Sequence, residues 1–183
     1  ISYTKAQCGE DYDETAAKAY DLAVIVHGTG RTATQYRDLF ADFAQRHDCI
    51  VLAPLFPVGI IEPGDLANYK RIQFHDIRYD HVLLAMVDEV IAKYRVNGSR
   101  FLLYGYSGGG QFCQRFFMLH PERLQAVSIG APGVVTLLHA DYDWWVGVRD
   151  FEKRFGKALN LAALKALPVH MVVGKADMET WEI

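Results

Sequence analysis

The sequence predicts an α/β domain whose central sheet is mainly parallel and carries helices on both faces. Three observations predict this class. Short runs rich in β-branched residues alternate with longer segments of helical periodicity, each run ends in glycine, proline or a polar turn, and no repeat or low-complexity tract interrupts the alternation. Because 183 residues are enough for one hydrophobic core and too few for two ordinary ones, we expect a single domain over 1–183.

The expected strands are short and nearly all apolar, which is typical of strands that are covered on both faces of a sheet. In order along the chain they are residues 22–26, 49–53, 101–104, 126–129 and 169–173.

Three segments between these runs have the periodicity of helices. Residues 34–46 and residues 80–94 each place their apolar side chains on one face, as amphipathic helices do. Residues 111–119 are apolar on nearly all sides, which predicts a buried helix, and Pro121 ends it.

The segment 134–156 is less regular and unusually aromatic, and we expect it to be a candidate cap or lid. Trp144 and Trp145 within it are candidates for lining an acyl or aromatic pocket, and Tyr106 is a further candidate for the substrate pocket. Packing in the core would explain both tryptophans equally well.

Composition excludes several classes of protein. The 19 Lys and Arg residues against 22 Asp and Glu give a formal charge of −3, so no basic footprint for nucleic acid or an anionic membrane is present. Apolar residues make up 51% of the chain, which excludes intrinsic disorder. The uninterrupted apolar runs are only a few residues long, far short of a membrane span.

The sequence has three cysteines, Cys8, Cys49 and Cys113. Three are too few for a disulfide-stabilised scaffold, and their spacing is not that of a metal site. This usage favours a cytoplasmic setting over a secreted one. His75, Asp76, Asp80 and His81 lie near one another in sequence but match no recognised ligand spacing. We expect no metal and no cofactor, and we expect Asp80 to stabilise the start of a helix.

A candidate nucleophile lies in Gly105-Tyr106-Ser107-Gly108-Gly109, which fits the pattern G-x-S-x-G between a predicted strand and a predicted helix. A serine in such a sharp turn has a strained backbone, so the residues two before and two after it must be small. The turn exposes the hydroxyl at the carboxyl end of the sheet, above a helix N-terminus that favours negative charge. An ordinary glycine-rich turn between a strand and a helix, without a catalytic serine, would show the same sequence pattern.

A second glycine-rich turn, His27-Gly28-Thr29-Gly30, directly follows the first predicted strand. Its main-chain N–H groups are candidates for an oxyanion hole, with the Thr29 N–H and the Gly108 N–H as the two donors. We expect His27 to shape this loop rather than act as a general base.

Asp177 follows the last predicted strand in Gly174-Lys175-Ala176-Asp177, where the acid of a Ser-Asp-His triad belongs. There it would orient an imidazole and stabilise the imidazolium. A solvated aspartate in a turn is the alternative.

No histidine follows Asp177, although the general base of such a triad belongs there. His170 lies inside a predicted strand, and His120 lies about 20 Å along the helix from Ser107. His139 is the least implausible substitute. We therefore expect the base in a C-terminal segment beyond residue 183, on the same or a second chain, and little activity without it.

Four segments together resemble the α/β-hydrolases, in order and in spacing. They are residues 27–36 (HGTGRTATQY), 96–110 (VNGSRFLLYGYSGGG), 126–133 (AVSIGAPG) and 168–177 (PVHMVVGKAD). More narrowly, they resemble the poly(3-hydroxybutyrate) depolymerase-like and feruloyl-esterase-like serine esterases. This sequence has Gly30-Arg31 where that group often has Thr-Gln.

The resemblance implies an α/β-hydrolase fold with Ser107 as nucleophile, Asp177 as acid, and Thr29 and Gly108 as oxyanion donors. It also implies a histidine in a loop after the last strand and no cofactor. The expected activity is hydrolysis of a small-molecule or polymer carboxylic ester through an acyl-enzyme. A peptidase or acyltransferase with the same triad, and a non-catalytic binding module, remain alternatives.

Overall fold

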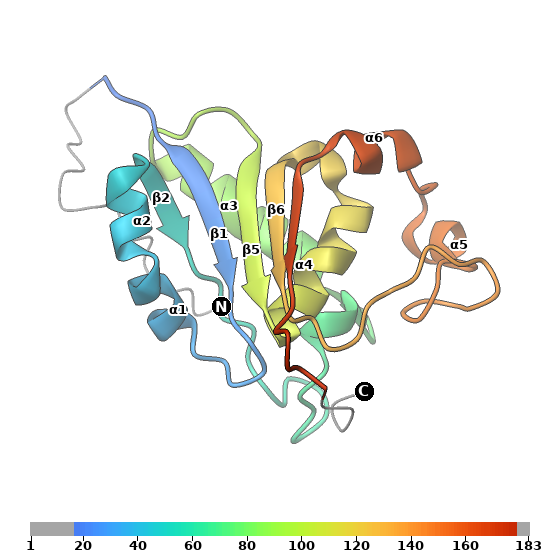
Figure 1. The fold of residues 1–183 in the computed structure, drawn as a ribbon. Helices are drawn as coiled ribbons and strands as arrows, with labels where there is room; N and C mark the ends of the chain where they lie inside the picture. Colours follow the sequence, from blue (N-terminus) through green and yellow to red (C-terminus); the bar gives the residue numbers. More distant parts are fainter. Residues whose placement is uncertain (1–16, 179–183) are drawn as a thin grey trace.

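The computed structural model describes residues 17–178 and contains a five-stranded, fully parallel sheet (Figure 1). Its strands lie in the order β2-β1-β5-β6-β7. Their bounds are Cys49–Leu52 for β2, Asp21–Val26 for β1, Phe101–Tyr106 for β5, Leu124–Gly130 for β6 and Val169–Val172 for β7. All five predicted strands are therefore confirmed.

The register of the sheet brings three strand ends to one level. Tyr106 at the end of β5 is opposite Gly130 at the end of β6, and Gly130 is opposite Val172 at the end of β7. Because the strands are parallel, the turns that follow them gather at the same edge of the sheet, at the bottom of Figure 1.

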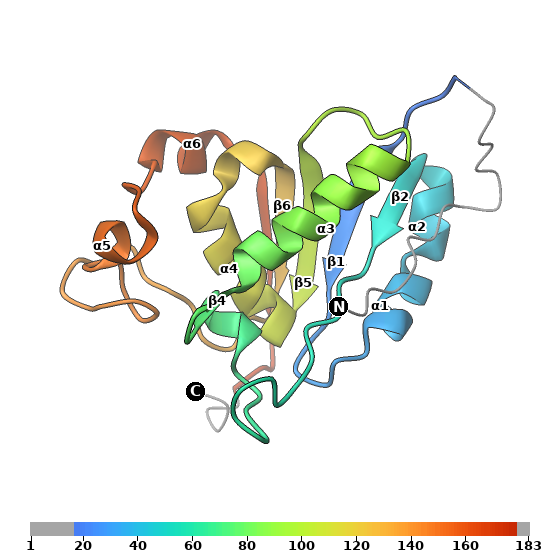
Figure 2. The same ribbon diagram turned by 180° about the vertical axis from the view of Figure 1, so that it is seen from behind.

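Helices cover both faces of the sheet, as predicted. Helices α1 (Ala33–Leu39) and α2 (Ala41–Arg46) lie on one face, and α3 (Tyr79–Lys93) and α4 (Gly108–Leu119) lie on the other (Figures 1 and 2). The larger hydrophobic core lies between the sheet and α3 and α4, and most residues of α4 are buried in it. The predicted helix 111–119 is thus confirmed, with a start three residues earlier.

The single helix predicted over 34–46 is wrong, because the chain breaks at Phe40 between α1 and α2. The Phe40 ring packs against Tyr104 of β5 at 4.8 Å and against Phe43 at 5.9 Å. Leu39 is left 77% exposed. On the two sides of the break, Phe40 and Phe43 pack against the sheet while Leu39 faces solvent.

The connections hold shorter elements that the periodicity does not predict. They are the 3₁₀ helices η1 (Tyr69–Arg71) and η2 (Pro121–Arg123), the hairpin of β3 (Gln73–Phe74) and β4 (Ile77–Arg78), and the helices α5 (Phe151–Phe155) and α6 (Leu161–Ala166).

Strand β7 differs from its prediction in one respect: it is exposed rather than covered on both faces. Val169 is 46% exposed and Met171 is 52% exposed. An apolar groove of about 470 Å³ runs over β5, β6 and β7 beside α2, and one of about 550 Å³ lies on the other face between β7, α4 and α6. The run is apolar, as in strands of a parallel sheet, but the described part of the chain leaves all four of its residues exposed.

Among the described residues, no helix is long and apolar enough to cross a membrane. Cys49 and Cys113 are buried free thiols, and burial raises the pKa of Cys49 to about 11. Cys8 lies outside the described residues.

Candidate functional site

Ser107 lies in the turn between β5 and α4 with a backbone that few non-glycine residues adopt. Its φ is 55° and its ψ is −121°. The Ser107 N–H donates to the Gly130 carbonyl oxygen at 2.9 Å, and the Gln111 N–H donates to the Ser107 carbonyl oxygen at 3.0 Å. A strained residue held by both neighbouring elements is what a nucleophile elbow requires.

The two glycines that flank Ser107 have no room for a side chain. A Cβ on Gly105 would lie 2.3 Å from the Gly109 carbonyl oxygen, and a Cβ on Gly109 would lie 2.3 Å from the carbonyl oxygen of Val26 in β1. Both obstacles are backbone atoms, which cannot move aside cheaply. The small residues that the G-x-S-x-G pattern demands are therefore required here by packing.

The loop after β1 lies directly against this turn. A Cβ built on Gly28 would lie 3.7 Å from the Ser107 Cβ, and a Cβ built on Gly108 would lie 3.0 Å from the Thr29 Oγ1. The fold thus brings together the two turns that were predicted separately, with Gly28 and Thr29 beside Ser107 and Gly108.

His27 is fully buried beneath this loop and makes two hydrogen bonds. Its Nδ1–H donates to the Gly28 carbonyl oxygen at 2.8 Å, and its Nε2 accepts from the Phe56 N–H at 3.0 Å. Burial lowers the pKa of His27 to about 4, against the hydrogen bond to Gly28, which raises it. With both ring nitrogens occupied, His27 supports the loop, in line with its predicted structural role.

Three polar side chains lie beside the site: Tyr36, which belongs to the segment 27–36 that resembles the esterases, and Tyr69 and Lys70, which the sequence does not mark. A Cβ on Gly28 would lie 3.2 Å from the Tyr36 Oη, and a Cβ on Gly108 would lie 2.7 Å from the Tyr69 Oη and 2.8 Å from the Lys70 Cε. Tyr69 also donates from its hydroxyl to the His27 carbonyl oxygen at 3.0 Å. No local pattern marks Tyr69 or Lys70, because they arrive from η1, some forty residues along the chain from the loop.

Asp177 lies in a turn beyond β7, at the same edge of the sheet as Ser107. Its N–H donates to the Gly174 carbonyl oxygen at 3.0 Å, and its side chain is exposed. No described side chain makes a hydrogen bond or ion pair with its carboxylate. Its role as the triad acid therefore stays a prediction.

No histidine within residues 17–178 makes a hydrogen bond with Ser107. His120 binds Asp80 at the far end of α4, which confirms that it is remote from the turn. His170 shares a 3.0 Å hydrogen bond with the hydroxyl of Ser128, and the exposed His139 lies 3.7 Å from a carboxylate oxygen of Asp141.

The predicted pocket residues have different surroundings. Tyr106 is 47% exposed and its ring lies over Gly130, because a Cβ there would meet the Tyr106 Cδ2 at 2.6 Å. Trp144 is buried against Phe155 at 4.9 Å, which is the core-packing alternative foreseen for it.

Two guanidinium groups lie close to the ring of Trp145. The Arg71 and Arg115 Cζ atoms are 4.9 and 5.3 Å from its ring centroid. Arg115 is fully buried and donates to the Thr136 hydroxyl at 2.9 Å and to the Lys70 carbonyl oxygen at 2.6 Å. These bonds attach the aromatic segment to α4, and its role as a cap stays a prediction.

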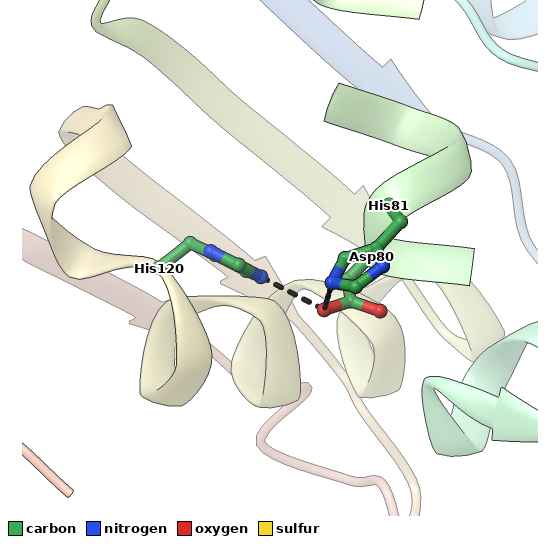
Figure 3. A group of neighbouring side chains, drawn as sticks. All are labelled: Asp80, His81 and His120. Atoms are coloured by element: carbon green, nitrogen blue, oxygen red, sulfur yellow. Dashed lines mark hydrogen bonds and ion pairs between the residues drawn. The ribbon is translucent and has the colours of Figure 1, made fainter. Parts of the chain in front are cut away.

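One cluster away from Ser107 has the residue types of a metal site. Asp80, His81 and His120 offer ligand atoms within 4.8 Å of one another (Figure 3). His120 Nε2 lies 2.8 Å and His81 Nε2 lies 3.8 Å from the Asp80 Oδ2.

The same carboxylate is already bound by Arg78, through bonds of 2.9 and 2.6 Å to its two oxygens. Burial alone would raise the pKa of Asp80, but the hydrogen bonds from His120 and Arg78 outweigh it and hold this pKa well below its usual range. A guanidinium on both carboxylate oxygens opposes a second cation, so we interpret the cluster as a buried ion network.

Comparisons with known proteins support the fold alone. No protein-family profile and no curated protein matches the chain. Among solved structures, the chain is similar to a poly(3-hydroxybutyrate) depolymerase from Bordetella parapertussis, with a TM-score of 0.75 and 23% identity over 96% of this chain and 60% of that one. It is similar to poly(aspartic acid) hydrolase-1 from Sphingomonas sp. KT-1, with a TM-score of 0.72 and 24% identity over 88% of this chain and 63% of that one.

A third similar structure is fluorophosphonate-binding serine hydrolase F from Staphylococcus aureus, with a TM-score of 0.61 and 13% identity over 93% of this chain and 81% of that one. The chain therefore has the α/β-hydrolase fold that the sequence predicts. It spans about three fifths of the length of the first two structures.

Proposed function

We propose that this chain forms the core of a serine hydrolase that cleaves carboxylic esters, with Ser107 as its nucleophile. One observation carries the proposal: a serine at positive φ, in a strand-to-helix turn whose flanking glycines admit no Cβ, faces a second glycine-rich turn. The depolymerase and the serine hydrolase among the similar structures support the same reaction class.

In the proposed reaction, the Ser107 Oγ attacks the ester carbonyl carbon while its proton passes to a histidine. The carbonyl oxygen becomes an oxyanion, which the main-chain N–H groups of Gly108 and Thr29 stabilise together with the N-terminus of α4. The alcohol leaves with the proton, and water then hydrolyses the acyl-enzyme. These steps use no cofactor.

The histidine is proposed to come from a segment outside the 183 residues, in the same polypeptide or in a partner chain, and Asp177 to orient it. The exposed apolar surfaces of β7, close to the turn that holds Asp177, offer such a segment a place to pack. Such a segment would supply the histidine that acts as general base and would cover the exposed edge of the sheet.

Two other functions are each favoured by one observation. Similarity to a hydrolase of poly(aspartic acid), whose residues are joined by amide bonds, favours amide hydrolysis. The lack of a described histidine at Ser107 favours a binding module that has kept the fold without the chemistry. Either would retain the geometry of the turn.

Labelling of the full-length protein with a fluorophosphonate probe tests the proposal. We expect one adduct, which peptide mapping locates on Ser107, and hydrolysis of p-nitrophenyl acyl esters. Ser107→Ala should abolish labelling and lower turnover by at least about 1,000-fold. Ser128→Ala, on the neighbouring strand β6, is the matched control and should label like the wild type.

The outcomes separate the three functions. Labelling at Ser107 with cleavage of short amides but not of esters would favour the amide hydrolase. A folded protein that neither labels nor turns over would exclude the hydrolase and favour the binding module.

A further inference from the structure

We propose that Arg31 is a positioning residue for the oxyanion hole, which it holds by fixing the two peptide groups that flank Thr29. This inference rests on the proposed function, because it assigns a task to the loop 27–31 that matters only if an oxyanion forms there. In the sequence, Arg31 is distinguished only as a departure from the resembling esterases.

The Arg31 side chain makes four hydrogen bonds, all to groups of the loops beside the site. Its Nη1 donates to the Thr29 carbonyl oxygen at 2.7 Å and its Nε to the Phe56 carbonyl oxygen at 3.2 Å. Its Nη2 donates to the Leu66 carbonyl oxygen and to the Asn68 Oδ1, both at 3.0 Å. One planar guanidinium thus joins the loop after β1 to the chain on both sides of residues 57–65.

The partners of Arg31 are themselves held in place. Asn68 donates from Nδ2 to the Pro57 carbonyl oxygen at 2.9 Å, and its Oδ1 accepts from the Tyr69 N–H at 2.7 Å. The Arg31 Cζ lies 4.7 Å from the Tyr69 ring centroid. The guanidinium therefore binds groups that are themselves hydrogen-bonded, which is what a positioning group needs.

The geometry of the peptide groups shows what these bonds do at Thr29. The Gly28 carbonyl oxygen accepts from the His27 Nδ1–H at 2.8 Å and from the Arg31 N–H at 3.2 Å. This carbonyl and the Thr29 N–H belong to one planar trans peptide, so holding the oxygen points the N–H the opposite way.

The next peptide, which joins Thr29 to Gly30, is held through the Thr29 carbonyl by Nη1 of Arg31. Arg31 therefore holds the Gly28–Thr29 peptide through its main-chain N–H and the Thr29–Gly30 peptide through its side chain. The turn that allows this needs a positive φ of 55° at Arg31, an uncommon value for a residue with a side chain. The four side-chain bonds offset that strain.

Kinetics of the full-length protein test this role in Arg31→Ala and Arg31→Lys, with Arg37→Ala as the matched control. Arg37 is on the adjoining helix α1, and within residues 17–178 its side chain binds only its neighbour Asp38, at 2.7 Å. Rates are expressed per active site titrated with the fluorophosphonate, so that misfolded protein does not count.

We expect Arg31→Ala to lower kcat by about 100-fold with KM changed less than about threefold, because the misplaced donor acts in the transition state. Arg31→Lys keeps the charge but cannot reproduce the four bonds of the planar guanidinium, and should fall between Arg31→Ala and the wild type. Added guanidinium ion should restore part of the kcat of Arg31→Ala and leave Arg37→Ala unchanged. A kcat of Arg31→Ala within about threefold of the wild type, or a loss confined to KM, would overturn the proposal.

Hydrogen exchange separates this inference from the proposed function. In Arg31→Lys, we expect faster amide exchange in peptides that cover 27–31 and 56–68, and unchanged exchange in α4. If the wild type shows no hydrolysis but exchange changes in this way, the loop-fixing role stands and the hydrolase proposal fails. Unchanged exchange in 27–31 would overturn the role of Arg31 whatever the activity.

Discussion

The Phe56 N–H donates a hydrogen bond to the Nε2 of His27 at 3.0 Å, across the base of the loop that carries Thr29. Because Nε2 accepts this bond, His27 must be neutral, with its proton on Nδ1, where it donates to the Gly28 carbonyl oxygen. Protonation of Nε2 would break the bond and place a charge at a fully buried position.

The buried state of His27 predicts a loss of stability in mild acid. Its pKa is about 4 in the folded protein against 6.5 when unfolded, so between these values the unfolded chain binds more protons than the native one. The free energy of unfolding should therefore fall by roughly 3 kcal/mol as the pH drops from above 6.5 to 4. The pH dependence that Asp80 adds lies outside this window. Because the pKa of Asp80 is lowered in the folded protein, its contribution to the free energy of unfolding is lost only as the pH falls below about 4.

Urea unfolding at pH 7 and at pH 4.5 measures this effect. His27→Gln should be less stable than the wild type at pH 7 but lose much less stability on acidification. His47→Gln, which removes an exposed histidine, should keep the wild-type pH dependence. An equal slope in His27→Gln and the wild type would contradict the assignment.

Gly109→Ala should be severely destabilising, because its Cβ would lie 2.3 Å from the Val26 carbonyl oxygen and 2.7 Å from that of His27. Both are backbone atoms of β1 and its loop, so α4 would have to move from the sheet. We expect a loss of at least about 2 kcal/mol in thermal or urea unfolding. Gly30→Ala, whose Cβ would meet only the Thr32 Cγ2 at 3.9 Å, should change stability by less than about 0.5 kcal/mol.

Asp80→Ala should cost about 3–5 kcal/mol, because it leaves Arg78 and the buried His120 without their shared carboxylate. Asp88→Ala removes an ion pair of similar length, 2.7 Å to Arg123, but Asp88 is exposed and the loss should stay below about 1 kcal/mol. Urea unfolding of both variants makes the comparison. A wild-type Tm that rises strongly with Zn²⁺ would instead indicate a metal site at Asp80, His81 and His120.

The exposed apolar surface of β7 predicts that the 183-residue chain associates with itself in solution. Sedimentation at increasing concentration should show oligomers in the wild type and mainly monomer after Val169→Lys with Met171→Lys. Leu39→Lys, at a leucine on α1 outside both grooves, should leave the association unchanged. A wild type that stays monomeric throughout would show that these grooves do not drive association.

Much of the candidate site could be predicted because its parts are local. The G-x-S-x-G turn is specified by glycines that are required within four residues of one another, and the loop after β1 by its place at the end of a strand. Parallel pairing then brings both turns to one edge of the sheet, since β1 and β5 are neighbours.

Other features could not be predicted, because they depend on residues far apart in the chain. Periodicity treats Phe40 as one more apolar position, whereas the helix breaks at this residue and its ring packs against Tyr104. The bond between Asp80 and His120 spans forty residues. The apolar run of β7 also predicts burial, but the strand is exposed. Whether a strand is covered depends on which segments pack against it and not on its own residues.

By itself, the sequence determined the strands, the two sharp turns and their order, because steric limits on glycine and the period of apolar side chains act over a few residues. Only the tertiary structure decided that His27 is neutral, that Arg31 holds the carbonyl of Thr29, and that β7 is exposed. Protonation, hydrogen bonding and burial depend on the groups that surround a side chain, and packing of the whole chain supplies them.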